Sequence, residues 1–218
     1  MRILRRPTPT EPEQSMELLP TKIVGVGVNY RKHASEMGKE LPEEPLIFLK
    51  PPSALVGTGE TVYLPKGYNR IDHEAELGVV VGERITRRSP DEIAERILGF
   101  TCVNDVSVRD LQKSDGQWTR AKGFDTFCPI GPRIVGGIDP GKLTISAKVN
   151  GEVRQNSSTS DMVFSVYELL SFISFVMTLE PHDVVTTGTP EGVGPISDGD
   201  VVQVEISEIG VLENKVKG

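Results

Sequence analysis

Short apolar runs, bounded by Gly, Pro and polar residues, are the commonest hydrophobic pattern in this chain, and they are typical of β-strands. One longer segment, Ser165 to Thr178, has the period of an amphipathic helix and is expected to be the main core helix. Strands and helices do not alternate regularly, so we predict a mixed, β-rich α+β fold with few helices, a roll or sandwich, rather than a doubly wound sheet. The predicted strands cover residues 22–28, 46–49, 61–64, 72–81, 97–103, 201–206 and about 211–216.

Turn and capping residues predict the shorter elements. Residues 29–38 are expected to form a short helix that Gly38 closes. Ser89-Pro90-Asp91-Glu92 has the pattern of a capping box and predicts a helix that runs to about Arg96. Asn150-Gly151 supplies the two positive φ angles of a type I′ turn, which predicts a β-hairpin.

Proline-rich stretches indicate irregular structure. Residues 6–20 contain Pro7, Pro9, Pro12 and Pro20 among polar residues and are expected to form an irregular arm or linker. A second Pro- and Glu-rich segment, 39–45, is expected to be a loop. We therefore divide the chain into an N-terminal arm, residues 1–20, and one catalytic domain, residues 21–218.

Length, composition and charge narrow the class of protein. A chain of 218 residues with 37% hydrophobic and 25% charged residues is typical of one soluble globular domain. The net charge of −7 argues against binding to nucleic acid or to an anionic membrane. There is no apolar run of membrane-spanning length and no signal-peptide pattern, so we expect a cytoplasmic protein. Cys102 and Cys128 lack metal-binding spacing and are expected to be reduced, buried thiols.

The segment from Asp72 to Val81 carries the first candidate chemistry. If it is a strand, Glu74 and Glu76 point to one face, because side chains alternate with period 2. A third carboxylate, Asp105, follows the apolar run 97–103. Three converging carboxylates would suit Mg²⁺ or Mn²⁺ with positions left for a chelating substrate. By spacing alone, the pattern is more typical of a half-exposed antiparallel strand, in which Glu is an ordinary polar residue, than of a metal site.

Two glycine-rich segments resemble nucleotide-binding motifs only in part. Gly25-Val26-Gly27 lacks the third glycine of a dinucleotide fingerprint, because residue 30 is Tyr. The segment from Gly188 to Gly194 lacks the Lys-Ser/Thr of a P-loop and is expected to be a tight turn whose N–H groups could bind an anion. A nucleotide-dependent oxidoreductase is therefore disfavoured.

Six blocks, in order and covering the chain from about residue 22 to near its end, resemble the fumarylacetoacetate hydrolase superfamily. They are Gly27-Val28-Asn29-Tyr30 with His33 and Glu36, the segment from Phe48 to Ala54, Glu74-x-Glu76, Asn104-Asp105 with Arg109-Asp110, Lys122-Gly-Phe-Asp125, and the segment from Thr187 to Gly194. The resemblance is to the branch of acylpyruvases and 2-hydroxyhepta-2,4-diene-1,7-dioate isomerases. It implies a homodimer with the β-sandwich roll of that superfamily and a bound divalent metal.

The resemblance also implies roles for individual residues. The metal ligands would be Glu74, Glu76 and Asp105, with Lys122 beside the metal. His33 and Glu36 would form a catalytic pair on a mobile segment, and their spacing places them on one face of a helix. The substrate would contact Arg109, Gln112 and Thr189. Val28 departs from the pattern, because several acylpyruvate-cleaving relatives carry Arg there.

The resemblance implies chemistry on a 2-oxo acid through a metal-stabilised enolate, which can lead to several reactions. Hydrolysis of an acylpyruvate such as fumarylpyruvate or acetylpyruvate, or decarboxylation of oxaloacetate, is slightly favoured. The block from Lys122 to Pro129 is also similar to that of the dienedioate isomerases and decarboxylases of aromatic catabolism. A non-catalytic protein that binds a small acid is a further alternative.

Overall fold

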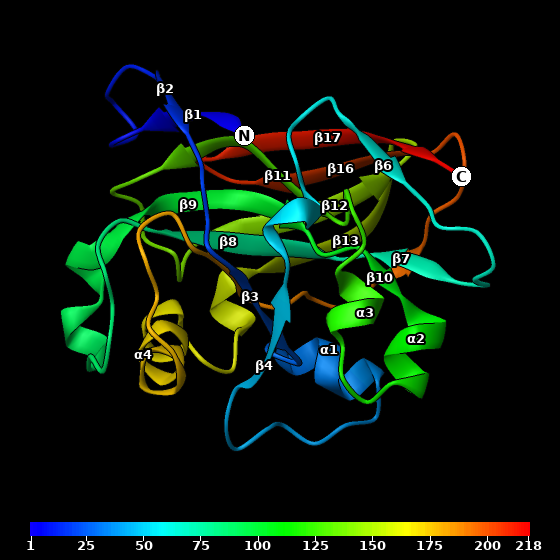
Figure 1. Ribbon diagram of the computed structural model, residues 1–218, viewed down its shortest axis with the longest axis horizontal. Helices are drawn as coiled ribbons and strands as arrows, with labels where there is room; N and C mark the ends of the chain where they lie inside the picture. Colours follow the sequence, from blue (N-terminus) through cyan, green and yellow to red (C-terminus); the bar gives the residue numbers. More distant parts are fainter.

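The computed structural model describes residues 1–218, and one long mixed sheet forms its centre (Figure 1). The strands of this sheet are β1 (Arg2–Arg6), β2 (Gln14–Glu17), β3 (Ile23–Gly27), β4 (Leu46–Lys50), β5 (Leu55–Val56), β8 (Ala75–Val81), β9 (Ile97–Asn104), β11 (Cys128–Val135) and β14 (Val184–Thr186). Their order is β2-β1-β11-β9-β8-β14-β3-β4, with β5 attached to β11. The long central pair, β8 and β9, is antiparallel.

Two smaller sheets complete the β structure. The first has the order β13-β12-β16-β17-β6 and the second the order β10-β7-β15. Their strands are β6 (Thr61–Tyr63), β7 (Ile71–His73), β10 (Ser107–Val108), β12 (Thr144–Val149), β13 (Glu152–Ser158), β15 (Gly194–Pro195), β16 (Val201–Ile206) and β17 (Gly210–Lys217). Strands β12 and β16 pack on β8 and β9. Leu77, Val79, Ala147 and Val204 are buried where these strands meet, so the main core lies between the two large sheets.

The helices are short. They are α1 (Arg31–Glu36), α2 (Arg109–Ser114), α3 (Thr119–Lys122) and α4 (Val166–Val176), with 3₁₀ turns η1 (Pro52–Ala54), η2 (Pro90–Glu92), η3 (Ala94–Arg96) and η4 (Thr159–Asp161). The longest, α4, begins with a capping box between Ser165 and Glu168 and buries Leu169, Leu170 and Ile173 in the main core. In Figure 1, α1, α2 and α3 lie towards one end of the large sheet and α4 lies apart from them.

The predicted mixed, β-rich fold with few helices is confirmed. The strand over residues 201–206 matches β16, and the helix over residues 165–178 matches α4. The hairpin at Asn150-Gly151 is also confirmed, because both residues have positive φ, 54° and 81°, between β12 and β13. Short α1 forms where predicted, and residues 39–45 form a loop.

Two local predictions differ from the structure. The capping box at Ser89 and Glu92 forms, but it begins the 3₁₀ turns η2 and η3 rather than a continuous α-helix. The expected irregular arm, residues 6–20, is irregular at its four prolines, but residues 14–17 form strand β2, which pairs with β1. Strand β1 pairs in turn, in parallel, with β11. The division into an arm and a catalytic domain stays a prediction.

The two thiols, Cys102 and Cys128, are buried and unbonded to each other, as predicted. Burial raises the pKa of each thiol to about 12, so both are protonated at neutral pH and unreactive. Separately, none of the helices is both long and apolar enough to cross a membrane.

A buried carboxylate, Asp183, joins the start of β14 to the start of β3. Its Oδ1 accepts hydrogen bonds from the backbone N–H groups of Thr21 (2.8 Å) and Lys22 (3.0 Å), and its Oδ2 accepts one from the N–H of Glu180 (2.8 Å). The Lys22 ammonium also pairs with it. Burial by itself would raise the pKa of Asp183, but these hydrogen bonds outweigh it and lower the pKa.

We expect Asp183→Ala to lower the free energy of unfolding at neutral pH by about 3 kcal/mol, because three partly buried backbone hydrogen bonds and the pair with Lys22 lose their charged acceptor. The folded-state pKa lies below that of the unfolded chain, so this contribution is present above the unfolded value and is lost as the pH falls through the folded value. Urea unfolding at neutral and acidic pH measures both effects. Asp91→Ala, at an exposed position, is the control. An equal loss at both pH values would contradict the prediction.

Candidate metal centre

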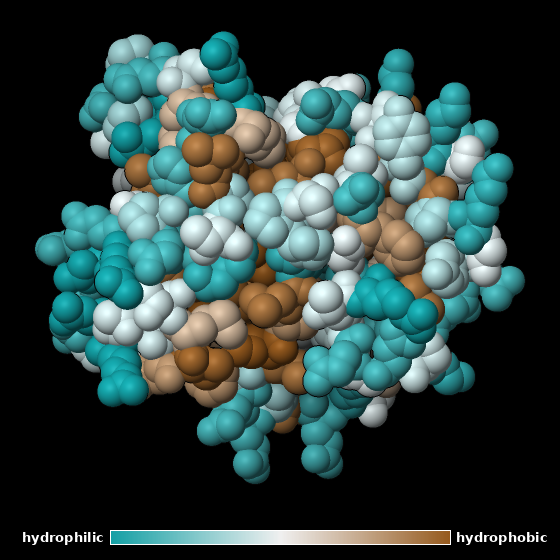
Figure 2. Space-filling model, viewed as in Figure 1, coloured by the Kyte–Doolittle hydropathy of each residue, from teal (hydrophilic) through white to brown (hydrophobic).

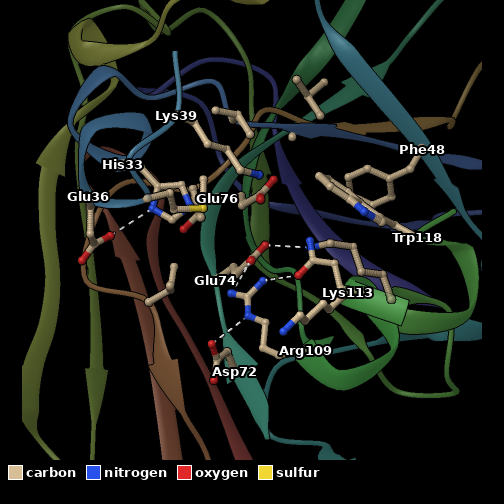
Figure 3. Close-up of a pocket in the computed structure, with 18 of the residues that line it drawn as sticks. His33, Glu36, Lys39, Phe48, Asp72, Glu74, Glu76, Arg109, Lys113 and Trp118 are labelled. Carbon is tan, nitrogen blue, oxygen red and sulfur yellow. Dashed lines mark hydrogen bonds and ion pairs between the residues drawn. The ribbon is translucent and has the colours of Figure 1, made fainter. Parts of the chain in front are cut away.

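Three carboxylates converge where β7, β8 and β9 meet. Glu74 lies between β7 and β8, its N–H donates to Asn104 Oδ1 (3.0 Å), and its carbonyl accepts from the N–H of Asp105 (2.9 Å). Glu76 lies two residues further along β8, on the same side as Glu74. One oxygen from each of Glu74, Glu76 and Asp105 lies within 4.8 Å of the others, and all three residues are buried. Figure 3 shows Glu74 and Glu76 at the centre of a cavity.

Positive charges surround two of the three carboxylates but not the third. Asp105 pairs with Lys50 and with Lys122 (2.6 Å). Glu74 pairs with Lys122 (2.8 Å) and Arg109 (2.6 Å). Glu76 pairs with no cation and accepts one hydrogen bond, from the N–H of Gly188 (2.9 Å).

This unequal pairing separates the pKa values of the two glutamates. Burial by itself would raise the pKa of Glu74, but the charges of Lys122 and Arg109 outweigh it and hold the pKa at about 2. For Glu76, burial and then the carboxylates of Asp105 and Glu74 raise the pKa well above its usual value. The cluster therefore lacks one cation at Glu76.

The donor set fits a hard divalent cation such as Mg²⁺ or Mn²⁺. It consists of carboxylate oxygens with neither His nor Cys, and these are the ligands that such ions prefer. A divalent ion would also supply the positive charge that Glu76 lacks. Glu74, Glu76 and Asp105 are thus the residues that could hold a metal.

Two lysines form the cationic side of the centre. Lys122 ends α3, is buried, and also donates to Ser107 Oγ (2.7 Å). Burial would lower its pKa, but Asp105 and Glu74 outweigh burial and raise it, so the ammonium stays charged. Lys50, at the end of β4, is also fully buried and donates to the carbonyl of Phe127 (2.8 Å). Sequence reasoning did not assign a role to Lys50, although a lysine that ends an apolar strand was an available signal.

A series of ion pairs leads towards solvent from the carboxylate triad, the name used here for Glu74, Glu76 and Asp105. Arg109 begins α2 and donates from Nε to Asp72 Oδ2 (2.7 Å) and from Nη1 to Gln112 Oε1 (2.6 Å). Asp72, in β7, is fully buried and also accepts from Arg70 Nε (2.8 Å). Sequence reasoning identified Arg109 and Gln112 but missed Asp72 and Arg70, because only the fold brings β7 and α2 together.

On the other side of the cavity, α1 presents His33 and Glu36 (Figure 3). His33 Nδ1 and Glu36 Oε2 lie 3.1 Å apart, on one face of the helix as their spacing predicts. The Glu36 carboxylate also accepts a hydrogen bond from the N–H of Gly192 (3.3 Å). His33 is buried, and its contact with Glu36 leaves the Nε2 atom free of a partner in the chain.

The glycine-rich segment after β14 is not the tight turn that was predicted, because residues 187–193 form no hydrogen-bonded turn and bend only at Glu191. Its N–H groups bind the carboxylates of Glu76 and Glu36, so the anions they hold belong to the chain itself. Gly188 has a φ of 88°, and a Cβ there would lie 2.9 Å from Asn29 Cβ, which explains the glycine. Thr189 Oγ1 accepts a hydrogen bond from Gln155 Nε2 (2.8 Å). Gln155 belongs to β13, and the sequence analysis did not place it near the site.

The cavity has a volume of about 710 Å³. Phe48 and Trp118 form an aromatic wall, with ring centroids 5.5 Å apart, opposite His33 and Glu36 (Figure 3). Of the residues that sequence reasoning put in the site, Asp105 alone lies beneath the cavity surface. The others line it: His33, Glu36, Glu74, Glu76, Arg109, Gln112, Lys122 and Thr189.

Comparison with known proteins gives a family and several close relatives. Residues 22–217 match the family described as "Fumarylacetoacetate (FAA) hydrolase C-terminal". An uncharacterised protein from Methanocaldococcus jannaschii is 53% identical, over 92% of this chain and 85% of that protein. The mitochondrial oxaloacetate tautomerase FAHD2A from Bos taurus is 44% identical, over 90% of this chain and 67% of that protein.

Solved structures of similar sequence have the same fold. The crystal structure of 5-carboxymethyl-2-hydroxymuconate delta-isomerase from Mycobacterium smegmatis superposes with a TM-score of 0.88 at 43% identity. The match covers 99% of this chain and 93% of that structure. The fold of this chain is therefore the fold of that protein.

Proposed function

Because the chain belongs to the fumarylacetoacetate hydrolase family, we propose that it is a divalent-metal-dependent enzyme that isomerises or tautomerises a 2-oxo acid. One observation carries the proposal: a buried carboxylate triad, with a cation missing at Glu76, lies in a cavity that also contains His33. The triad provides a place for the metal, and His33 provides a group that can move a proton.

The residues of the centre have distinct roles in this proposal. Glu74, Glu76 and Asp105 would hold Mg²⁺ or Mn²⁺, which when bound supplies a Lewis acid that stabilises negative charge on the 2-oxo oxygen. The ammonium of Lys122, held between Glu74 and Asp105, contributes a fixed positive charge beside the same oxygen. Its rigid position matters, because a preorganised charge needs no rearrangement when the substrate reacts.

On the opposite side, His33 would move the proton. Glu36 binds His33 Nδ1, so the free Nε2 can take a proton from C3 of the substrate or return one there. Glu36 is itself held by the N–H of Gly192, and this keeps the imidazole oriented towards the cavity. Arg109 donates a hydrogen bond to Gln112 at the cavity wall, and the two would orient the substrate carboxylate, while Thr189 would contact its 2-oxo end.

Isomerisation is preferred over cleavage because relatives that align over most of this chain are named a tautomerase and a delta-isomerase. Both names describe movement of a proton without breaking a carbon–carbon bond. The second candidate is the cleavage that the sequence slightly favoured: hydrolysis of an acylpyruvate, or decarboxylation of oxaloacetate. The His33–Glu36 pair favours hydrolysis, since the two groups could hold an attacking water between them.

A second copy of this chain is the proposed protein partner. Large apolar side chains are exposed on the edge strand β4 (Leu46, Leu49) and at the end of α4 (Phe175, Val176), and Figure 2 shows brown side chains gathered over this region. An exposed apolar surface beside an unpaired strand edge favours self-association. Light scattering after size exclusion should give twice the mass of the chain, and a monomeric mass would contradict a homodimer.

The test of the proposed function uses protein stripped of metal and reloaded with Mg²⁺ or Mn²⁺. The acids are enol-oxaloacetate, a 2-hydroxy-dienedioate, fumarylpyruvate and acetylpyruvate, followed by ultraviolet absorbance and by pyruvate release. Metal-dependent spectral change without pyruvate would support isomerisation, whereas metal- and enzyme-dependent pyruvate from oxaloacetate, fumarylpyruvate or acetylpyruvate would support cleavage. If metal binds but no acid reacts, the chain is a binding protein and the proposal is wrong.

We expect His33→Ala to lower kcat by about a hundredfold or more while the metal still binds, because general acid–base catalysis typically contributes that much. Steady-state kinetics and a metal titration measure the two quantities separately. Ser35→Ala, at an exposed position on the same helix, is the control. An unchanged kcat in the His33 variant would remove the His33–Glu36 pair from the mechanism.

A further inference from the structure

A buried glutamine joins the metal centre to the glycine-rich segment that follows β14. Gln155 is the one buried residue of β13, an edge strand, and only 1% of its surface is exposed. Its Oε1 accepts a hydrogen bond from the N–H of Ala75 (2.9 Å), the residue between the two glutamates of the carboxylate triad. Its Nε2 donates to Thr189 Oγ1 and to the carbonyl of Pro190, both at 2.8 Å. Gln155 does not line the cavity itself, so it can affect a bound ligand only through these partners.

The backbone around Gln155 is shaped for this contact. The pairing of β12 with β13 shifts at Arg154, which has no partner in β12 and forms a β-bulge. A bulge redirects the side chains next to it, and here the next side chain is that of Gln155. The glycine-rich segment packs directly on the bulge, because a Cβ on Gly192 would lie 2.1 Å from the carbonyl oxygen of Arg154. The amide of Gln155 is therefore held against the segment by backbone packing as well as by its hydrogen bonds.

The direction of each hydrogen bond follows from the partner. The backbone N–H of Ala75 can only donate, so the amide oxygen of Gln155 must face it. The carbonyl of Pro190 can only accept, which places the NH₂ group on the other side, where its second proton reaches Thr189. The hydroxyl of Thr189 therefore accepts from Gln155, and its own proton has no partner in the chain. Because Thr189 lines the cavity, that proton is available to an oxygen atom of a bound ligand.

We propose that Gln155 is a positioning residue that makes Thr189 a hydrogen-bond donor towards the cavity. The ligand group that Thr189 favours is then an accepting oxygen with negative charge, such as a carboxylate or an enolate oxygen. The inference rests on the proposed function for the contact between Thr189 and the substrate, and it adds the residue that sets the direction of this contact. The hydrogen bond to Ala75 fixes the position of the donor relative to the carboxylate triad.

The test measures ligand binding. The Mn²⁺-loaded protein is titrated with oxalate, a small dianion that offers two adjacent oxygens to the metal as a 2-oxo acid does. Trp118 is the only tryptophan in the chain and lines the cavity, so its fluorescence reports binding there. We expect Thr189→Val, which removes the hydroxyl but keeps the shape, to raise the Kd of oxalate about tenfold, because a hydrogen bond to a charged oxygen is worth at least that factor. Thr189→Ser keeps the hydroxyl and should bind oxalate as the unmodified protein does.

A double variant separates positioning from support of the fold. We expect Gln155→Met alone to raise the Kd of oxalate by about the same factor as Thr189→Val, because the hydroxyl is no longer held as a donor. If Gln155 acts through Thr189, the double variant should bind oxalate about as well as Thr189→Val alone. If Gln155 only supports the fold, the two losses should multiply to about a hundredfold, and this result would overturn the proposal.

Controls separate this inference from the proposed function. Gln14→Met makes the same change at an exposed position on β2 and should leave the Kd unchanged. The Tm and the Mn²⁺ affinity of each variant are measured first, and oxalate is added only at saturating Mn²⁺. If oxalate binds the unmodified protein and Thr189→Val equally well, this inference is wrong while the proposed function stands, even if Gln155→Met does not fold. If oxalate does not bind the Mn²⁺-loaded protein, the proposed function fails and this inference fails with it.

Discussion

Replacing Glu76 with Gln is expected to abolish metal binding and activity without destabilising the metal-free protein. Glu76 is the one carboxylate of the triad that lacks a cation, and burial with the neighbouring Asp105 and Glu74 disfavours its charge. A neutral amide of the same shape removes this repulsion and can keep the hydrogen bond from Gly188. The metal-free variant should therefore be as stable as the unmodified protein, or more stable.

The same change removes one of three ligands from the metal. We expect activity to fall by at least about a hundredfold, because a Lewis acid contributes several kcal/mol to the barrier. Added metal should no longer raise the Tm, whereas it should stabilise the unmodified protein by about 2.7 kcal/mol at a hundred times its Kd. Thermal unfolding with EDTA and with Mn²⁺ measures this, and Glu95→Gln, at an exposed position, is the control. A normal metal-induced rise in Tm would exclude Glu76 as a ligand.

Replacing Lys122 with Met is expected to have the opposite effect to Glu76→Gln: it should destabilise the metal-free protein and leave metal binding in place. The Lys122 ammonium lies between Glu74 (2.8 Å) and Asp105 (2.6 Å), and removing it leaves buried negative charge with fewer partners. Breaking a buried ion pair in this way costs about 3 kcal/mol or more, so the Tm in EDTA should fall clearly. Asp105 keeps Lys50, and Glu74 keeps Arg109, so the chain should still fold.

Metal should rescue the stability of the Lys122 variant but not its activity. A divalent cation replaces the missing charge, so the metal-induced rise in Tm should exceed that of the unmodified protein. Activity should stay down by about a hundredfold, because the fixed charge beside the substrate oxygen is lost. Lys215→Met is the control for charge removal. An equal loss of metal binding in the Lys122 and Glu76 variants would mean that Lys122 acts only by holding the ligands in place.

Local sequence predicted the elements whose stabilising contacts are close along the chain. The helix α4 begins at Ser165 because the residue three positions on is Glu168, and the hairpin at Asn150-Gly151 forms because both residues accept positive φ. His33 and Glu36 share a face of α1 because of their spacing. Strand β2, within the expected irregular arm, was not predicted because it pairs with β1, which is itself held by β11 more than a hundred residues away, and local propensity cannot report on such a contact.

The candidate site also combines features that local sequence predicts with features that only the fold decides. The period of a strand places Glu74 and Glu76 on one face, and the family blocks supply the other residue types. Only the fold brings Asp105 beside them, through the pairing of Ala75 with Asn104 in β8 and β9. The ion pairs that set the charge of the centre join residues far apart in the chain, such as Lys50 with Asp105.

The sequence by itself therefore determined the β-rich class, the short helices and turns, and the chemical types of the site residues, because each depends on neighbours within a few positions. Tertiary structure decided which charges are paired and which are not. It left Glu76 without a cation and gave the single carboxylate of Asp72 two guanidinium partners, Arg70 and Arg109. The physical reason is that electrostatic compensation depends on distance in space, which strand pairing and packing set, and not on distance along the chain.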